Sequence, residues 1–80
     1  SMTIPANFDG AHVPHSHEGE ECVILQTGTL VATVGGQDFV LEAGDSLTYD
    51  ASVPHWWSNH TSSAAVMLAI STPPSLGKAH

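Results

Sequence analysis

The chain has 80 residues, of which 41% are hydrophobic and 11% are charged. This length and composition predict one compact domain, and no apolar run approaches the ~20 residues that a membrane helix needs. Eight acidic residues against Lys78 alone give a formal net charge of −7, which argues against nucleic-acid binding by this chain because such a surface repels phosphate backbones.

Short apolar runs rich in valine, threonine and leucine recur between turn signals, and no apolar period of 3.6 residues lasts for three turns. This pattern predicts an all-β fold. We expect strands near residues 12–17, 21–26, 29–34, 38–42, 46–49, 55–59 and 64–71. Gly35-Gly36 predicts a two-residue hairpin loop, because such a loop needs positive φ at both positions. Pro73-Pro74 is expected to end the sheet.

The two ends of the chain are expected to lie outside the barrel. We predict a leader over residues 1–8, a barrel over 9–71 and a C-terminal tail over 72–80. Ser1-Met2 resembles a cleavage scar, which suggests a piece of a longer protein. The first ten residues lack the basic start and apolar centre of a signal peptide, and the single Cys22 cannot form an intrachain disulfide. We therefore expect a cytoplasmic protein.

The most informative motif is His15-Ser16-His17 followed by Glu21. Two imidazoles at positions i and i+2 project from the same face of a strand. With Glu21 and a distant His55 they would supply three nitrogens and one oxygen, a set suited to zinc, iron, nickel, manganese or copper. The alternative is that these are surface histidines beside an acidic loop. The same alternation places Cys22 on the opposite face, so Cys22 is not expected to be a ligand.

These residues resemble the two sequence motifs of the cupin superfamily. His15, His17, Glu21 and Gly28 have the spacing of the first motif, although Gly10 is one position too close to His15. Gly44, His55 and Asn59 have the spacing of the second motif, in which Asp50 and Ser52 replace the family's proline and glycine. The resemblance covers most of the chain. It implies a small β-barrel with jelly-roll topology and a divalent transition metal (Zn, Fe, Ni or Mn) held by His15, His17, Glu21 and His55.

Several other residues are candidates for the neighbourhood of this site. Asn59, Tyr49, Glu18 and Glu20 are candidate acceptors for the imidazole N–H groups. For a small organic ligand the candidate binding residues are Tyr49, Trp57, Asn59, Val23 and Leu25. Packing in the core is the alternative for these side chains, since large aromatic and apolar residues usually pack. No residue is identified as a general acid or base for catalysis.

A narrower resemblance comes from His17-Glu18-Gly19-Glu20-Glu21, the two hairpin glycines and the ending Ser71-Thr72-Pro73-Pro74-Ser75. These segments are similar to the C-terminal cupin of helix-turn-helix transcription regulators. The resemblance implies a sensor domain that binds a small-molecule effector, a DNA-binding part elsewhere, and a homodimer. The alternative is a stand-alone metal-dependent cupin enzyme, namely a dioxygenase, isomerase or lyase, for which a complete ligand set is needed.

Overall fold

The computed structural model describes residues 1–72 of the chain. Its elements are seven strands and one short 3-10 helix: β1 (Met2–Ile4), η1 (Gly10–His12), β2 (Glu20–Thr27), β3 (Thr29–Val34), β4 (Gln37–Glu42), β5 (Ser46–Asp50), β6 (His55–Ser58) and β7 (Ala65–Ser71). No helix in residues 1–72 is long and apolar enough to span a membrane. The predicted stop at Pro73-Pro74 and nearly all of the predicted tail lie outside the described residues.

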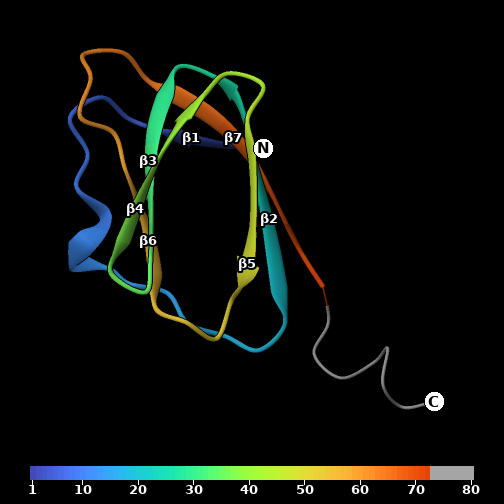
Figure 1. Cartoon of the computed structure of the whole chain (residues 1–80). Helices are drawn as coiled ribbons and strands as arrows, with labels where there is room; N and C mark the ends of the chain where they lie inside the picture. The colour runs from blue at the N-terminus through green and yellow to red at the C-terminus, as the bar shows by residue number, and fades with distance from the viewer. Residues whose placement is uncertain (73–80) are drawn as a thin grey trace.

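The strands form two facing antiparallel sheets, which confirms the predicted all-β class (Figure 1). One sheet has the order β1-β7-β2-β5 and the other has the order β4-β3-β6. Neighbours in both sheets include strands far apart in sequence, because β2 pairs with β7 and β3 pairs with β6. Each sheet is therefore assembled through long-range pairings that a strand-by-strand prediction does not contain.

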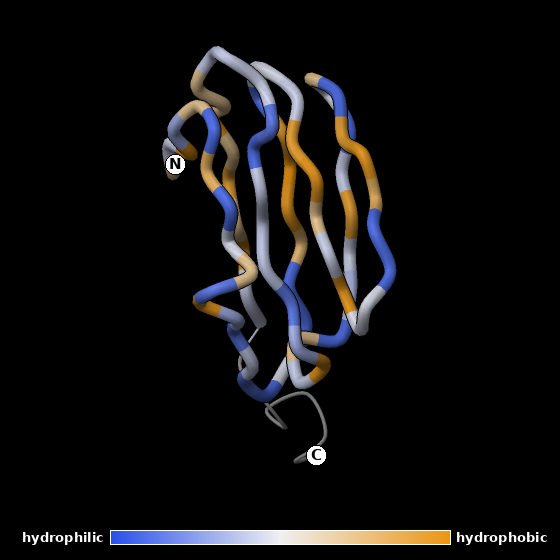
Figure 2. Tube along the Cα trace, turned by 90° about the vertical axis from the view of Figure 1, so that its left-hand side faces the viewer, coloured by the Kyte–Doolittle hydropathy of each residue, from blue (hydrophilic) through white to orange (hydrophobic). Residues whose placement is uncertain are grey.

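The core lies between the two sheets, and the side-chain alternation of the strands fills it. Along β2, Glu21, Val23 and Leu25 are buried while Cys22 and Ile24 are only half-buried, as the sequence predicts. Figure 2 shows hydrophobic residues concentrated along the strands, with mostly hydrophilic turns at their ends. The inward face of β2 thus carries one carboxylate among fully buried aliphatic side chains.

The N-terminal segment differs from its prediction. Residues 2–4, predicted as part of a leader, form strand β1, which pairs with β7 from Met2↔Met67 to Ile4↔Ala65. Ile4 is 5% exposed and belongs to the hydrophobic core. The prediction failed because three residues are too short for a periodicity argument, and burial of Ile4 against β7 supplies the missing stabilisation.

The predicted strand over residues 12–17 is also wrong. Asp9 accepts a hydrogen bond from the backbone N–H of Ala11 and caps η1, so the chain turns where an extended strand was expected. Pro14 has no N–H to donate to a ladder. Only a single bridge remains, in which the backbones of His15 and His55 exchange two hydrogen bonds of 2.8 and 2.9 Å.

Three glycine positions are explained by backbone conformation or by close packing. Gly35 and Gly36 have φ values of +58° and +81°, which confirms the predicted hairpin between β3 and β4. Gly10 lies so close to β6 that a Cβ atom there would overlap the carbonyl oxygen of Trp57. The requirement for glycine at position 10 therefore comes from packing against β6.

Candidate metal centre

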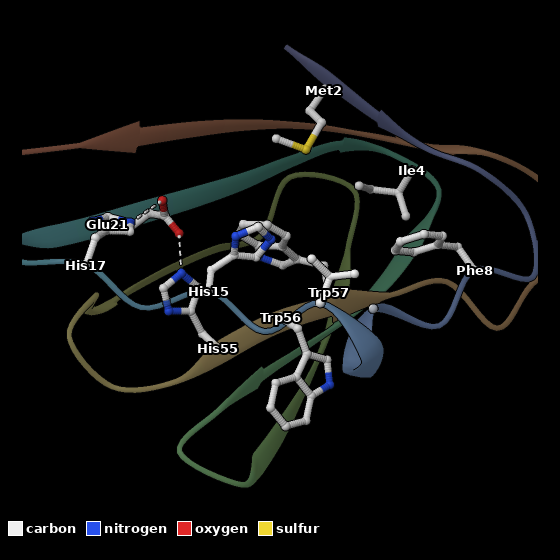
Figure 3. A pocket seen from close by; sticks show the side chains of 11 residues that line it. Met2, Ile4, Phe8, His15, His17, Glu21, His55, Trp56 and Trp57 are labelled. Carbon is white, nitrogen blue, oxygen red and sulfur yellow. Dashed lines mark ion pairs between the residues drawn. The ribbon is translucent and has the colours of Figure 1, made fainter.

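Three of the four predicted ligands meet at one end of the barrel. One ligand atom from each of His17, Glu21 and His55 lies within 4.8 Å of the other two. Nε2 of His17 is 3.6 Å from one carboxylate oxygen of Glu21, and Nε2 of His55 is 3.4 Å from the other (Figure 3). The loop before β2, strand β2 and strand β6 contribute one residue each, so the fold holds the cluster from three directions.

Backbone carbonyl groups orient both imidazoles of the cluster. Nδ1 of His55 lies 2.9 Å from the carbonyl oxygen of Val53, and Nδ1 of His17 lies 3.1 Å from that of Glu18. A carbonyl oxygen can only accept, so Nδ1 is the donor in each contact and Nε2 is the nitrogen left to face the Glu21 carboxylate. The sequence predicted side-chain acceptors for these N–H groups, but in both rings a backbone carbonyl oxygen is the acceptor.

The geometry of His55 fits a cation in this position. The ring is 1% exposed and its Nε2 is buried without a hydrogen-bond partner. A lone pair directed at the Glu21 carboxylate at 3.4 Å is repulsive unless a proton or a positive ion lies near both atoms. Two imidazole nitrogens and a carboxylate oxygen are donors that zinc, iron, nickel and manganese accept. The residues present therefore fit a divalent transition metal.

His15, the fourth predicted ligand, lies beside this cluster rather than in it. Its exposed ring packs against Trp57, with ring centroids 5.2 Å apart, and its centroid is 6.0 Å from that of His55. The prediction placed it on one strand face with His17. Because this segment is not a regular strand, His17 joins the three-residue cluster while His15 lies beside it against Trp57.

Two hydroxyl groups fix the carboxylate of Glu21. The Tyr49 hydroxyl donates to one oxygen and the Ser71 hydroxyl, at 3.1 Å, donates to the other. Tyr49 comes from β5 and Ser71 from the end of β7, so β2 is flanked by a donor on each side. Ser71 was not predicted at the site, because the β2–β7 pairing that brings it to Glu21 joins residues 50 positions apart.

Burial and the neighbouring Glu21 carboxylate hold the pKa of Tyr49 well above its usual range. Tyr49 is the only tyrosine in the chain, so a spectrophotometric pH titration reports on it alone. In the folded, metal-free protein we expect no tyrosinate absorbance as the pH passes about 10, whereas the unfolded chain should titrate there. Because the pKa of Tyr49 is higher in the folded state than in the unfolded chain, the neutral tyrosine stabilises the folded state. Its contribution to the free energy of unfolding is complete below about pH 10 and is lost as the pH rises further. Tyrosinate appearing at about pH 10 in folded protein would contradict the assignment.

A pocket of about 380 Å³ extends from the cluster along the inside of the barrel. Its polar lining consists of His15, His17, Glu21 and His55, and its other lining residues are Met2, Ile4, Phe8, Gly10, Val13, Trp56 and Trp57. Figure 3 shows the cluster at one end and Ile4 and Phe8 at the other. The volume is within the range of small-molecule sites.

Of the five residues predicted to bind a ligand, the pocket lining contains only Trp57. Val23 and Leu25 are fully buried in the hydrophobic core, and Tyr49 is also a core residue. The Asn59 side chain faces away from the imidazoles: it donates to the carbonyl groups of Ile4 and Ser63 and accepts from Thr61. Asn59 therefore has a structural role in this arrangement and is not an imidazole acceptor.

The cupin domain model matches residues 2–71. This chain belongs to the cupin domain family. The match includes β1, in agreement with the finding that residues 2–4 are part of the fold.

Relatives of this cupin domain include transcription regulators. The chain is 35% identical over 57 residues to the HTH-type transcriptional regulator PuuR of Escherichia coli, which covers 71% of this chain and 31% of the regulator. The same figures hold for PuuR of Shigella flexneri. The chain thus spans about a third of the length of the curated relatives it matches, and it is homologous to the cupin part of such regulators.

Solved structures show the same fold. A cupin protein from Bacteroides fragilis superposes with a TM-score of 0.79 at 26% identity, covering 98% of this chain and 64% of that one. The Cupin_2 domain of an XRE family transcriptional regulator from Enterobacter cloacae has a TM-score of 0.77 at 19% identity, covering 90% of this chain and 76% of that one.

Where this cupin domain departs from the second motif, the structure supplies a substitute. The carboxylate of Asp50 accepts hydrogen bonds from the backbone N–H and the hydroxyl of Ser52, at 3.0 and 2.7 Å. These bonds lower the pKa of Asp50. An aspartate that bonds two residues ahead forms a local turn. The turn that proline and glycine give in the family motif is therefore held here by side-chain hydrogen bonds.

The apolar end of the pocket was missed by the sequence analysis. Met2, Ile4, Phe8 and Val13 precede His15 and were assigned to the leader or to the wrong strand. The only signal in the sequence was the alternation of Met2 and Ile4, which predicts a shared face once residues 2–4 are read as a strand.

Proposed function

We propose that this cupin domain is the metal-containing sensor of a transcription regulator and binds a small-molecule effector in its pocket. The observation that carries the proposal is the 35% identity to the HTH-type regulators. The pocket next to the His17, Glu21 and His55 cluster supports it. The DNA-binding part would lie outside these 80 residues, since an acidic domain is a poor partner for phosphates. We place such a regulator in the cytoplasm and propose that it is a homodimer.

The metal would be held by His17, Glu21 and His55, and we propose His15 as the fourth ligand. The His15 ring is exposed and has no hydrogen-bond partner within residues 1–72, so rotation about its side-chain bonds can bring a nitrogen toward the cluster. A bound metal supplies a positive charge and open positions for an effector group. The residues of the chain orient it: Tyr49 and Ser71 fix Glu21, and backbone carbonyls fix the two rings.

The test uses the full natural protein, beginning with the coding sequence upstream of the codon for Thr3. We expect an in-frame helix-turn-helix there. Elemental analysis should find bound metal, and removing it or adding the effector should change operator affinity about fivefold or more, a typical coupling between two sites. The variant His55→Ala should lose both the metal and this response. The matched control His60→Ala removes an exposed histidine outside the cluster and should keep both.

A second candidate function is an iron-dependent oxygenase, which the donor set of two histidines and one carboxylate favours. Oxygen uptake on an organic substrate by the iron-loaded protein would support it. Turnover, or an upstream sequence without a DNA-binding domain, would overturn the sensor proposal. Metal binding with a ligand-dependent change in operator affinity and no turnover would overturn the oxygenase.

A further inference from the structure

The pocket has two chemically different halves. The His17, Glu21 and His55 cluster and His15 form one end, whereas the other end has only apolar lining residues. Met2, Ile4 and Phe8 come from β1 and the segment after it, and Figure 3 shows them across the pocket from the cluster. A ligand that fills this space must carry its polar group at one end and an apolar body at the other.

The charge of the lining limits the polar group. Residues 1–72 contain no lysine or arginine, so within this part of the chain only the lining histidines, or a metal bound to them, can neutralise an anion in the pocket. With a divalent metal beside the single carboxylate of Glu21, the polar end carries an excess positive charge that one carboxylate of a ligand would balance. The apolar end offers nothing to a second charged group, which would be buried without a partner.

Backbone hydrogen bonds fix the N-terminal segment that forms the apolar half of the pocket. Backbone hydrogen bonds from Asn7 to Thr61 and between Phe8 and Asn59, with lengths of 2.8 to 3.0 Å, hold the segment on the barrel. Trp57 lines the same pocket from β6 and is 9% exposed. Phe8 is 37% exposed and Met2 is 42% exposed, so both retain apolar surface for a ligand to cover.

We propose that the pocket binds a monocarboxylic acid with an aliphatic or aromatic body, whose carboxylate faces the metal and whose body packs on Met2, Ile4, Phe8 and Trp57. The proposal rests on the proposed function, because it takes the metal site as given and names the class of effector. It applies equally if the bound acid is a substrate.

The experiment titrates the cobalt-loaded protein with acetate, butyrate and hexanoate and follows the visible spectrum of the metal. Affinity should rise with chain length by up to about fourfold per methylene, the gain expected when a methylene leaves water for an apolar wall. Hexanol lacks the anion, hexylamine has the wrong charge and adipate carries a second carboxylate. All three should bind at least tenfold more weakly than hexanoate.

Variants locate the apolar body. Phe8→Ala should weaken hexanoate roughly tenfold, since it removes apolar wall, and should leave acetate unchanged. The matched control Val40→Ala shortens an apolar side chain that is 63% exposed and does not line the pocket, and it should change neither affinity. Hydrogen exchange of the Asn7 and Phe8 amides should slow when hexanoate binds.

The outcomes separate this inference from the proposed function. Equal affinities for acetate and hexanoate, or a chain-length effect that survives Phe8→Ala, would overturn the ligand class while leaving the metal site and the sensor role intact. Tighter binding of hexylamine than of hexanoate would assign the opposite ligand charge. Absence of a cobalt spectrum in wild-type protein would instead overturn the metal centre on which both proposals rest.

Discussion

Glu21→Gln is expected to lower the affinity for a divalent metal by roughly 100-fold or more, because loss of even an outer partner of a ligand costs 10–100-fold. The substitution keeps the shape of the side chain and removes its charge. Each carboxylate oxygen of Glu21 faces a histidine Nε2, at 3.6 Å for His17 and 3.4 Å for His55. The substitution therefore removes negative charge from the atoms that would bind the metal ion. Competition against a chelator with a metal-sensitive dye measures the affinity.

The stability of the metal-free protein should respond differently to this substitution. The Glu21 side chain is 7% exposed, and a neutral amide avoids the cost of burying a charge, so the free energy of unfolding should stay within about 1 kcal/mol of wild type. Glu20→Gln is the matched control, because Glu20 is the exposed neighbour and should change neither quantity. An unchanged metal affinity in Glu21→Gln would show that the ligand set is wrong.

Asn59→Asp is expected to lower the free energy of unfolding by about 3 kcal/mol, with Asn59→Ala at least as damaging. The Asn59 side chain is fully buried, and its amide nitrogen donates to the carbonyl groups of Ile4 and Ser63 at 3.2 and 2.8 Å. Aspartate puts an oxygen in place of that donor, so two carbonyl oxygens lose their partner and face a third oxygen. Urea denaturation followed by circular dichroism measures the change.

Ser62→Ala provides the control for Asn59, since Ser62 is exposed in the same loop and should change stability by less than about 0.5 kcal/mol. The amide of Asn59 ties β1, the end of β6 and the loop before β7 together, so a small effect of Asn59→Asp would mean that these contacts contribute little. That result would also remove the structural explanation for asparagine at this position of the motif.

The local features of the fold were accessible from the sequence. Residues 29–34 were predicted with the bounds that β3 has, and the hairpin glycines were assigned for the correct reason. Alternation placed Glu21 inward and Cys22 outward on β2. These features depend on neighbouring residues only, and a period of two or a pair of glycines encodes them directly.

The N-terminal part was not accessible, because its conformation depends on distant partners. Residues 2–4 are a strand only through pairing with β7, and residues 10–12 turn because Asp9 caps them and Gly10 packs against Trp57. Only the Asp9 cap is a local contact, whereas the β1–β7 pairing and the packing of Gly10 on Trp57 join residues far apart in the sequence. The apolar lining of the pocket comes from this segment, so the sequence did not predict it either.

The sequence by itself determined the fold class, the donor types and their spacing, and the inward direction of Glu21. Only the tertiary structure decided which donors meet: His17, Glu21 and His55 converge, while His15 packs on Trp57. It also decided that backbone carbonyls orient the rings and that Tyr49 and Ser71 hold the carboxylate. The physical reason is that strand alternation fixes only the face on which a side chain lies, whereas distances between side chains depend on the long-range pairing of β2 with β5 and β7 and of His15 with His55.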